Sequence, residues 1–414
     1  MNIFKWPIYS QTILAMVLGA FTGVLLGPKA EELGVAAKYI IELIKTVATP
    51  LLFLAIFDAF VSVNLKGRGF FWLLFVCLFN ALCSITIALT ISHLFKPGSY
   101  LIIDSALKKL AKAPESLNVH FHWDLFRANG RSAHFFTGTT AAIAIAVASG
   151  FIFLLFKWVL GQRFKRVQES FQSINAKGLE FLYKVIGYLV HLTPIAVFTA
   201  MAKVVGTQGF GAMKGLVAYL LACAGGMLLQ VILVYQSWIK LFAKRNLRGF
   251  WAITKEPMIY SFGVNSSLAT LPLTLKALKK LNVSEGSARL AACIGTNLNN
   301  DGILLYEVVA ALFVVQAFGW QLSLGQELVL SLICVIATIG VAGVPDAGMI
   351  SLSLVLSSVG LPIEILPVLM TVDWVLARLR SVNNVIGDIT GAIAIDAIMK
   401  PNENTESSIP RSSF

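Results

Sequence analysis

The residues best able to do chemistry lie close together near the carboxyl end of the chain. Charged or amide side chains there are separated by seven, four and four residues: Asp373, Arg380, Asn384 and Asp388. With a helical period of 3.6 residues, this spacing predicts that they lie on or near one face of a helix. Carboxylates and amides suit a hard cation, whereas a guanidinium suits a carboxylate. The segment therefore predicts binding of ions of both signs.

The composition places this polar segment inside a membrane protein. The chain of 414 residues is 57% hydrophobic and only 13% charged, with a mean hydropathy of +0.79, against about 25% charged residues in soluble domains. Much of the net charge of +12 lies in short loops between apolar runs, which is typical of membrane topology signals and not of a nucleic-acid-binding surface. The five cysteines all fall in apolar segments without a CxxC pair, so we expect them to be buried, with no disulfide or zinc site.

Six apolar runs precede residue 245, and a bilayer crossing takes about 20 residues. They cover residues 11–28, 40–63, 70–95, 135–160, 179–205 and 216–242. Basic loops follow the second, fourth and sixth runs, which predicts a cytoplasmic N-terminus. Pro194 predicts a kink in the fifth run. The polar stretch 96–133 separates the third and fourth runs, and we expect the polar tail 401–414 to be disordered.

After residue 250 the apolar stretches are interrupted by Gly, Pro, Ser and Asn. The clearest interruptions are residues 265–272 and 340–348, and neither sequence favours an unbroken helix. Each is followed by an apolar helix that contains Asn and Asp, at residues 297–302 and 383–388. Broken backbone at membrane depth must be buried in protein or line a water-filled cavity. This internal repeat is therefore a pattern that indicates a transporter's binding site.

Two polar clusters carry the candidate chemistry, and each has alternative explanations. The first, Asn299, Asp301, Asn384 and Asp388, could bind sodium, take up protons, or only cap and brace the broken helices. The second consists of Arg378 and Arg380. Arg380 is two turns from Asp373, beyond the usual i,i+4 pairing. We therefore expect at least one arginine to lack a partner on its own helix and to pair with an anionic ligand or a carboxylate elsewhere.

These motifs resemble those of the dicarboxylate/amino acid:cation symporters, which include the excitatory glutamate transporters and their prokaryotic homologues. The resemblance covers nearly the whole chain and rests on residues 266–272, 299–303, 343–345 and 380–388. It implies an all-α polytopic membrane protein with eight transmembrane helices, two re-entrant helical hairpins and inverted repeats. It also implies a homotrimer in the plasma membrane (the inner membrane in a bacterium), with both termini cytoplasmic and an elevator-type movement.

The resemblance divides the chain into functional regions. Residues 1–245 would form mainly the scaffold and trimerisation region, with the third and sixth spans joining the transport region, and residues 246–400 would form the transport core. It implies transport and not enzyme activity, no prosthetic cofactor, and sodium as the coupling ion, with protons as the alternative. The implied partners are a small anionic substrate, membrane lipid and further copies of the chain, with no nucleic acid.

The resemblance also assigns roles to residues. Arg380 would hold the substrate's distal carboxylate, and Ser267 with the first hairpin tip would hold the other carboxylate. The expected substrate-binding residues are Asn265, Ser266, Ser267, Asn300, Gly343, Val344, Gly348, Arg378, Arg380, Ser381 and Asn384. The expected sodium ligands are Gly295, Asn299, Asn384 and Asp388 at one position and Asn299 and Asp301 at another, with a weaker assignment for Asn80. The second interruption would be the extracellular gate.

Departures from the family pattern set the expected substrate. Amino acid transporters of the family carry a second aspartate where this chain has Ala377, which disfavours recognition of an amino group. The other departures are Ile303 for threonine, Asn300 for methionine, Leu268 for serine, and Cys77, Asn80 and Ala81 for the tyrosine, threonine and serine of the third span. We therefore expect a sodium-coupled C4-dicarboxylate symporter. An acidic or other amino acid symporter and a proton-coupled or anion-conducting member are the alternatives.

Overall fold

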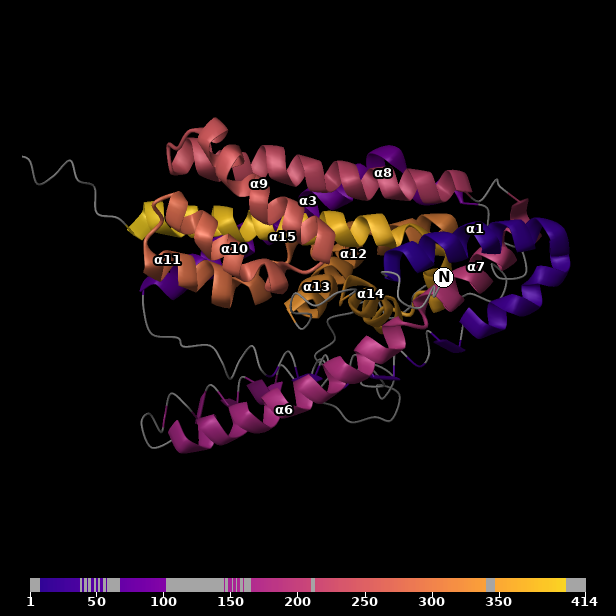
Figure 1. The fold of residues 1–414 in the computed structure, drawn as a ribbon, viewed down its shortest axis with the longest axis horizontal. Coiled ribbons are helices and arrows are strands. Elements are labelled where there is room, and N and C mark those ends of the chain that lie inside the picture. The colour runs from indigo at the N-terminus through magenta and orange to yellow at the C-terminus, as the bar shows by residue number, and fades with distance from the viewer. Residues whose placement is uncertain are drawn as a thin grey trace, which may run out of the picture.

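The chain folds into a bundle of long helices, and within the described residues all regular structure is helical in this computed structural model (Figure 1). The structure describes residues 8–37, 39–40, 68–101, 165–209, 213–339 and 347–399, together with separate positions between 43 and 57 and between 145 and 159. Three helical stretches in this part are long and apolar enough to cross a membrane, by length and composition: Ser10–Ala37, Gly69–Tyr100 and Lys214–Phe242.

The α-helices differ in length from one turn to more than nine turns. In chain order they are α1 (Ile8–Leu26), α3 (Arg68–Phe95), α6 (Lys165–Val190), α7 (Thr193–Gln208), α8 (Met213–Leu229), α9 (Leu247–Val264), α10 (Ser267–Lys280), α11 (Glu285–Arg289), α12 (Asp301–Ala317), α13 (Leu324–Ile339), α14 (Ala347–Ser358) and α15 (Leu366–Met399). Turns of 3₁₀-helix cover Gly27–Leu33, Pro97–Tyr100, Gly295–Asn297 and Ile363–Ile365, and π-helical turns cover Gln230–Tyr235, Trp238–Phe242 and Leu290–Ile294.

Several predicted apolar runs are confirmed as helices. Residues 11–28, 70–95 and 216–242 are helical throughout. The run 179–205 is divided between α6 and α7 at residues 191–192, just before Pro194, so the predicted kink is confirmed. Most of the runs 40–63 and 135–160, residues 102–133 of the polar stretch and the tail 401–414 lie outside the described residues. All five cysteines are free, but Cys293 is exposed and Cys83 is only partly buried, contrary to the expectation that all are buried.

The first predicted interruption is shorter than expected. Helix α9 ends at Val264 and α10 already begins at Ser267, so the break consists of two residues, and Pro272 lies inside α10. Asn265 adopts the left-handed conformation with φ 52°, which ends α9. Ser266 then caps α10 by accepting a hydrogen bond from the backbone N–H of Ala269 at 3.1 Å. Two capped helix ends therefore meet at this tip.

Helices α1 and α7 pack closely because small residues line their contact. A Cβ atom placed on Gly19 would lie 2.4 Å from the carbonyl oxygen of Phe198, and one on Gly23 would lie 2.5 Å from that of Ala202. On the α7 side, a Cβ on Gly206 would lie 2.4 Å from the carbonyl oxygen of Gly27. Backbones this close exclude any side chain, which is the packing that small residues permit between membrane helices.

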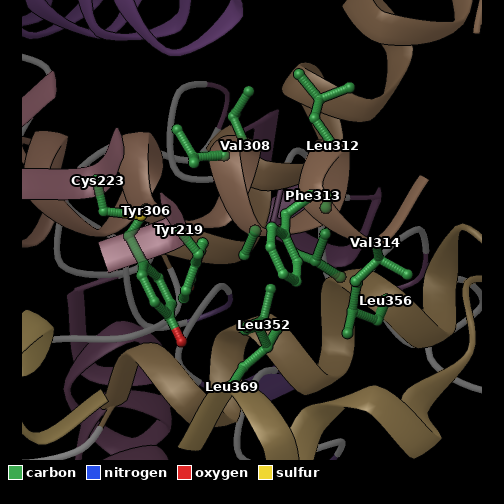
Figure 2. Close-up of a cluster of buried hydrophobic side chains, with 14 of the residues drawn as sticks. Tyr219, Cys223, Tyr306, Val308, Leu312, Phe313, Val314, Leu352, Leu356 and Leu369 are labelled. Atoms are coloured by element: carbon green, nitrogen blue, oxygen red, sulfur yellow. The ribbon is translucent and has the colours of Figure 1, made fainter. Parts of the chain in front are cut away.

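The core of the molecule is built around α12. Every residue of this helix is buried except Gln316, as expected for a helix that is apolar on all sides. Tyr306 and Phe313 of α12 pack with Tyr219 of α8, whose ring centroid is 5.1 Å from that of Phe313. Figure 2 shows these rings beside Leu352 of α14 and Leu369 of α15. Four helices therefore share one apolar cluster.

Helix α15 carries most of the predicted site. Its 34 residues span about 51 Å at 1.5 Å per residue, and it runs along the length of the bundle (Figure 1). It packs against α3, α8, α9, α10 and α12. The polar cluster 383–388 lies within this continuous helix. The corresponding cluster 297–302 was also expected in a helix, but the helix is interrupted at residues 298–300, just before α12.

Candidate functional site: a buried cluster of charges and amides

An ion pair fixes the guanidinium of Arg380 in the interior. Nη1 and Nη2 of Arg380 donate to the two carboxylate oxygens of Asp373 at 2.6 and 3.2 Å, and both side chains are buried. The guanidinium carbon also lies 4.0 Å from the ring centroid of Tyr306. The expectation that two helical turns are too far for this pair was wrong, because the long side chain of Arg380 leans towards the N-terminus of the helix and so reaches Asp373.

The N-terminal end of α14 lies against the same guanidinium. A Cβ atom on Gly348 would lie 2.7 Å from Cζ of Arg380 and 2.8 Å from Nε and Nη2. Only a glycine allows this approach without displacement of one partner. The expected substrate contacts Gly343 and Val344 lie outside the described residues.

The second arginine is also engaged on its own helix. Nη1 of Arg378 donates to the backbone oxygen of Trp374 at 2.6 Å, and the side chain is only 8% exposed. Both arginines therefore have partners on α15, which contradicts the expectation that at least one would have none. Ala377 is 3% exposed, so a buried methyl group stands at the position where the family resemblance predicts a carboxylate for an amino acid substrate.

The first break approaches α15 one residue after Arg380. The hydroxyl groups of Ser261 on α9 and Ser381 on α15 lie 2.7 Å apart. Ser266 and Ser267, at the start of α10, are both buried. A helix N-terminus carries partial positive charge and favours anions. Two of the expected substrate residues of this tip, Ser266 and Ser267, are thus buried on a helix that packs against α15, whereas Asn265 is partly exposed.

Amides join the break before α12 to both neighbouring segments. Oδ1 of Asn384 accepts from the backbone N–H of Gly302 at 2.9 Å, and its Nδ2 donates to Oδ1 of Asn300 at 3.3 Å. Nδ2 of Asn300 donates to the backbone oxygen of Thr338 in α13 at 3.1 Å. These contacts connect α15, the break and α13, so Asn384 and Asn300 brace the unwound backbone.

The predicted sodium ligands are brought together, but their oxygens differ in what they bind. The carbonyl oxygen of Gly295 accepts the backbone N–H groups of Leu298 and Asn299, each at 2.7 Å. Thr296 and Asn299 lie beside the carboxyl group of Asp388. Within the part of the chain that the structure describes, Oδ1 of Asp388 is buried without a hydrogen-bond partner. An orphaned carboxylate oxygen of this kind fits a bound cation.

Asp301 has a different environment, built partly by residues that the sequence did not single out. Its Oδ2 accepts from the hydroxyl of Tyr235 at 2.8 Å. Asn80 donates through Nδ2 to Oδ1 of Asn299 at 3.2 Å, and its own Oδ1 accepts from the indole N–H of Trp238 at 2.8 Å. Tyr235 and Trp238 were missed because they lie within an apolar run, where aromatic residues are ordinary core residues.

Glu307 is a second buried group that the motifs did not predict. It lies on α12, it is 0% exposed, and neither carboxyl oxygen has a hydrogen-bond partner among the described residues. Ser351 of α14 lies beside it. The available signal was a single acidic residue in the apolar stretch 303–315, since ionisable residues within membrane segments are rare and are candidates for function.

Long apolar helices around buried charges and amides are the arrangement of a membrane transport protein. The sequence pattern of the sodium:dicarboxylate symporter family matches residues 8–398, and the chain belongs to this family. The resemblance seen in the motifs is thereby confirmed.

Excitatory amino acid transporters are among the relatives. Human excitatory amino acid transporter 1 is 31% identical over 253 residues, which is 60% of this chain and 46% of the relative. Excitatory amino acid transporter 4 of the mouse is 33% identical over 233 residues, 56% of this chain and 41% of the relative. A putative sodium-dependent excitatory amino acid transporter of Caenorhabditis elegans is 32% identical over 243 residues, 58% and 48% respectively. The matched region covers less than half of each relative.

Proposed function

We propose that the chain is a secondary active symporter that couples sodium influx to the uptake of a small anion, a C4-dicarboxylate. The observation that carries this proposal is the buried guanidinium of Arg380, held by Asp373 and Tyr306. The ion pair uses two of the five guanidinium N–H donors, which leaves three for other acceptors. A carboxylate is the ligand that such a fork binds best.

A second carboxylate would bind at the start of α10. This helix begins at the buried residues Ser266 and Ser267 and packs against α15, which Ser261 of α9 also contacts. The partial positive charge of a helix N-terminus would complement an anion there. A dicarboxylate offers one charge to this helix end and the other to Arg380.

The methyl group at Ala377 favours a dicarboxylate over an amino acid. An ammonium group in this buried position would need an acceptor, and Ala377 supplies none. The second candidate is an acidic amino acid, which is favoured by the relatives named excitatory amino acid transporters. The same site could bind either substrate, and its preference depends on whether another acceptor reaches the amino group.

The cation supplies the driving force in this proposal. The orphaned Oδ1 of Asp388 supports sodium binding, and the unpartnered Glu307 is the group that favours the proton-coupled alternative. We also propose the family architecture of eight spans, two re-entrant hairpins and inverted repeats, in a plasma-membrane homotrimer with cytoplasmic termini. In its elevator movement residues 246–400 would form the transport core. The packing of α3 and α8 against α12 and α15 supports assigning those two helices to the same moving part.

The test is ligand-induced thermal stabilisation of the purified protein. Succinate, malate, fumarate, aspartate and glutamate are compared in sodium and in choline buffers, because a ligand that binds the folded state raises the melting temperature. We expect stabilisation by dicarboxylates that depends on sodium. Stabilisation by amino acids alone would establish the second candidate, and stabilisation that is equal in choline would exclude sodium coupling.

Arg380→Lys tests the residue that carries the proposal. It keeps the positive charge beside Asp373 but removes the fork, so we expect succinate affinity to fall about 10- to 100-fold, the loss of a hydrogen bond to a charged group being worth about 1.5–3 kcal/mol. Arg248→Lys is the matched control, since Arg248 is exposed near the start of α9. Unchanged succinate affinity in a folded Arg380→Lys protein would refute the assignment.

A further inference from the structure

One of the two predicted cation positions is surrounded by hydrogen-bond donors from the protein itself. Oδ2 of Asp301 accepts from Tyr235 at 2.8 Å, and the amide of Gln230 lies beside the same carboxyl group. The backbone oxygen of Asp301 accepts from the hydroxyl of Ser84 at 3.0 Å. A cation needs oxygens whose lone pairs are directed at it, and each O–H or N–H dipole here presents its positive end to those oxygens instead.

The amide oxygens near Asp301 are satisfied in the same way. Oδ1 of Asn299 accepts from Nδ2 of Asn80 at 3.2 Å. Asn80 in turn accepts twice: its Oδ1 from the indole of Trp238 at 2.8 Å, and its backbone oxygen from Nε2 of Gln230 at 3.2 Å. The indole N–H can only donate, so the Asn80 side chain is fixed with its amide nitrogen facing Asn299. This amide nitrogen is a donor where the predicted ligand set needs an acceptor.

The third span supplies few other oxygens at this position. Cys77 is buried in the apolar cluster that also contains Tyr235 and Trp238, and Ala81 has no polar side-chain atom. The donors Gln230, Tyr235 and Trp238 come from π-helical turns at Gln230–Tyr235 and Trp238–Phe242, and π-helical insertions shift the side chains that follow them and are frequent at functional sites. The other two donors, Asn80 and Ser84, lie on α3.

Asp388 provides the contrast on the neighbouring helix. Its Oδ1 has no hydrogen-bond partner in the part of the chain that the structure describes, although the residue is only 4% exposed. A buried carboxylate oxygen left without a donor costs free energy unless a ligand compensates it. The two aspartates therefore differ: Asp301 accepts a hydrogen bond from Tyr235 and has Gln230 beside it, whereas Oδ1 of Asp388 has no hydrogen-bond partner among the described residues, although Thr296 and Asn299 lie beside its carboxyl group.

We propose that the neutral donors Tyr235, Gln230, Asn80 and Trp238 take the place of one cation, so that the Asp301 position holds no sodium and coupling runs through Asp388. This inference rests on the proposed function, because it specifies how many of the predicted cation positions the symporter uses. If one sodium ion binds, the stability of the folded protein rises with the logarithm of the sodium concentration, with a slope that corresponds to one bound ion.

The experiment measures sodium binding directly, with sodium as the only probe. The melting temperature of the purified full chain is followed as sodium replaces choline at constant ionic strength, for the wild type, Asp301→Asn and Asp388→Asn. Asn at 301 can still accept the Tyr235 hydrogen bond. We expect the wild type and Asp301→Asn to show sodium midpoints within about twofold of each other and the slope of a single ion. Asp388→Asn should lose the response.

A loss of the sodium response in Asp301→Asn, or a midpoint at least tenfold higher, would overturn the inference. Tyr235→Phe provides a second readout if Asp301→Asn does not fold. It should lower the melting temperature at every sodium concentration and leave the midpoint unchanged, whereas a weaker midpoint would mean that Tyr235 supports a bound ion. A wild type that ignores sodium contradicts the proposed coupling itself. A wild type that responds, combined with an Asp301→Asn protein that does not, contradicts only the inference.

Discussion

Gly348→Ala is expected to weaken anion binding while leaving the fold intact. The added Cβ would lie 2.7 Å from Cζ of Arg380, and ordinary contact begins at 3.4 Å, so one partner must move by about 0.7 Å. The guanidinium is the flexible partner. If it moves, its longer hydrogen bond to Asp373 stretches from 3.2 Å to about 3.9 Å, beyond hydrogen-bonding range. The fork that would receive a carboxylate is then misplaced.

The magnitude is that of one charged hydrogen bond that the misplaced guanidinium would no longer make to succinate. Its loss is worth about 1.5–3 kcal/mol, which corresponds to about a 10- to 100-fold weaker succinate affinity. The assay is isothermal calorimetry of succinate binding in sodium buffer, with the melting temperature as a check on folding. Gly325→Ala is the control, because Gly325 is exposed on α13 and an added Cβ there meets nothing within 4 Å. Equal succinate affinity in Gly348→Ala and Gly325→Ala would refute the idea that α14 positions Arg380 for binding.

Two further predictions concern packing. Gly23→Ala should separate α1 from α7 and lower the melting temperature by several degrees, because its Cβ would lie 2.5 Å from a backbone oxygen that cannot rotate away. The control Gly225→Ala, with open space around the added Cβ, should leave the melting temperature unchanged. Equal melting curves for the two variants would contradict the close packing of α1 and α7. Phe313→Ala should cost about 3–5 kcal/mol in detergent unfolding, whereas Phe71→Ala, at a side chain that is 66% exposed, should cost far less. Comparable losses would argue against the cluster around α12.

The sequence predicted the elements better than the contacts. Apolar runs and the residue types at 265–266 were sufficient to locate several spans and the first break, because length and backbone preference are local properties. The break at 298–300 was not found in this way, since residues 297–302 were expected to lie in an apolar helix. Pro272 was assigned to the break, but it lies inside α10. The helix tolerates it because a proline at the sixth helical position removes only one backbone donor, and tertiary packing can override its preference. Helix boundaries are set by the helix as a whole and not by a single residue.

The site shows the same limit at the level of side chains. The spacing of Asp373 and Arg380 was judged by the distance between their positions on the helix, but the long side chain of Arg380, leaning towards the N-terminus, closes that distance. Tyr235 donates a hydrogen bond to Asp301, 66 positions later in the chain, and Trp238 donates one to Asn80, 158 positions earlier. No periodicity in one segment encodes such contacts, so the donors around Asp301 could be found only from the fold.

The two polar segments of the site differ in rigidity: residues 380–388 lie in a continuous helix, whereas residues 298–300 lie in a break between helices. Arg380 and Asp388 are eight residues apart on the unbroken α15, which fixes their separation along the axis at about 12 Å. Residues 298–300 facing them have no such rigidity and are held by side-chain amides. Strain introduced by an ion or an anion therefore falls on the backbone before α12. Hydrogen exchange in that short segment should therefore change when the cation or the anion binds, while the distance between Arg380 and Asp388 along α15 stays constant.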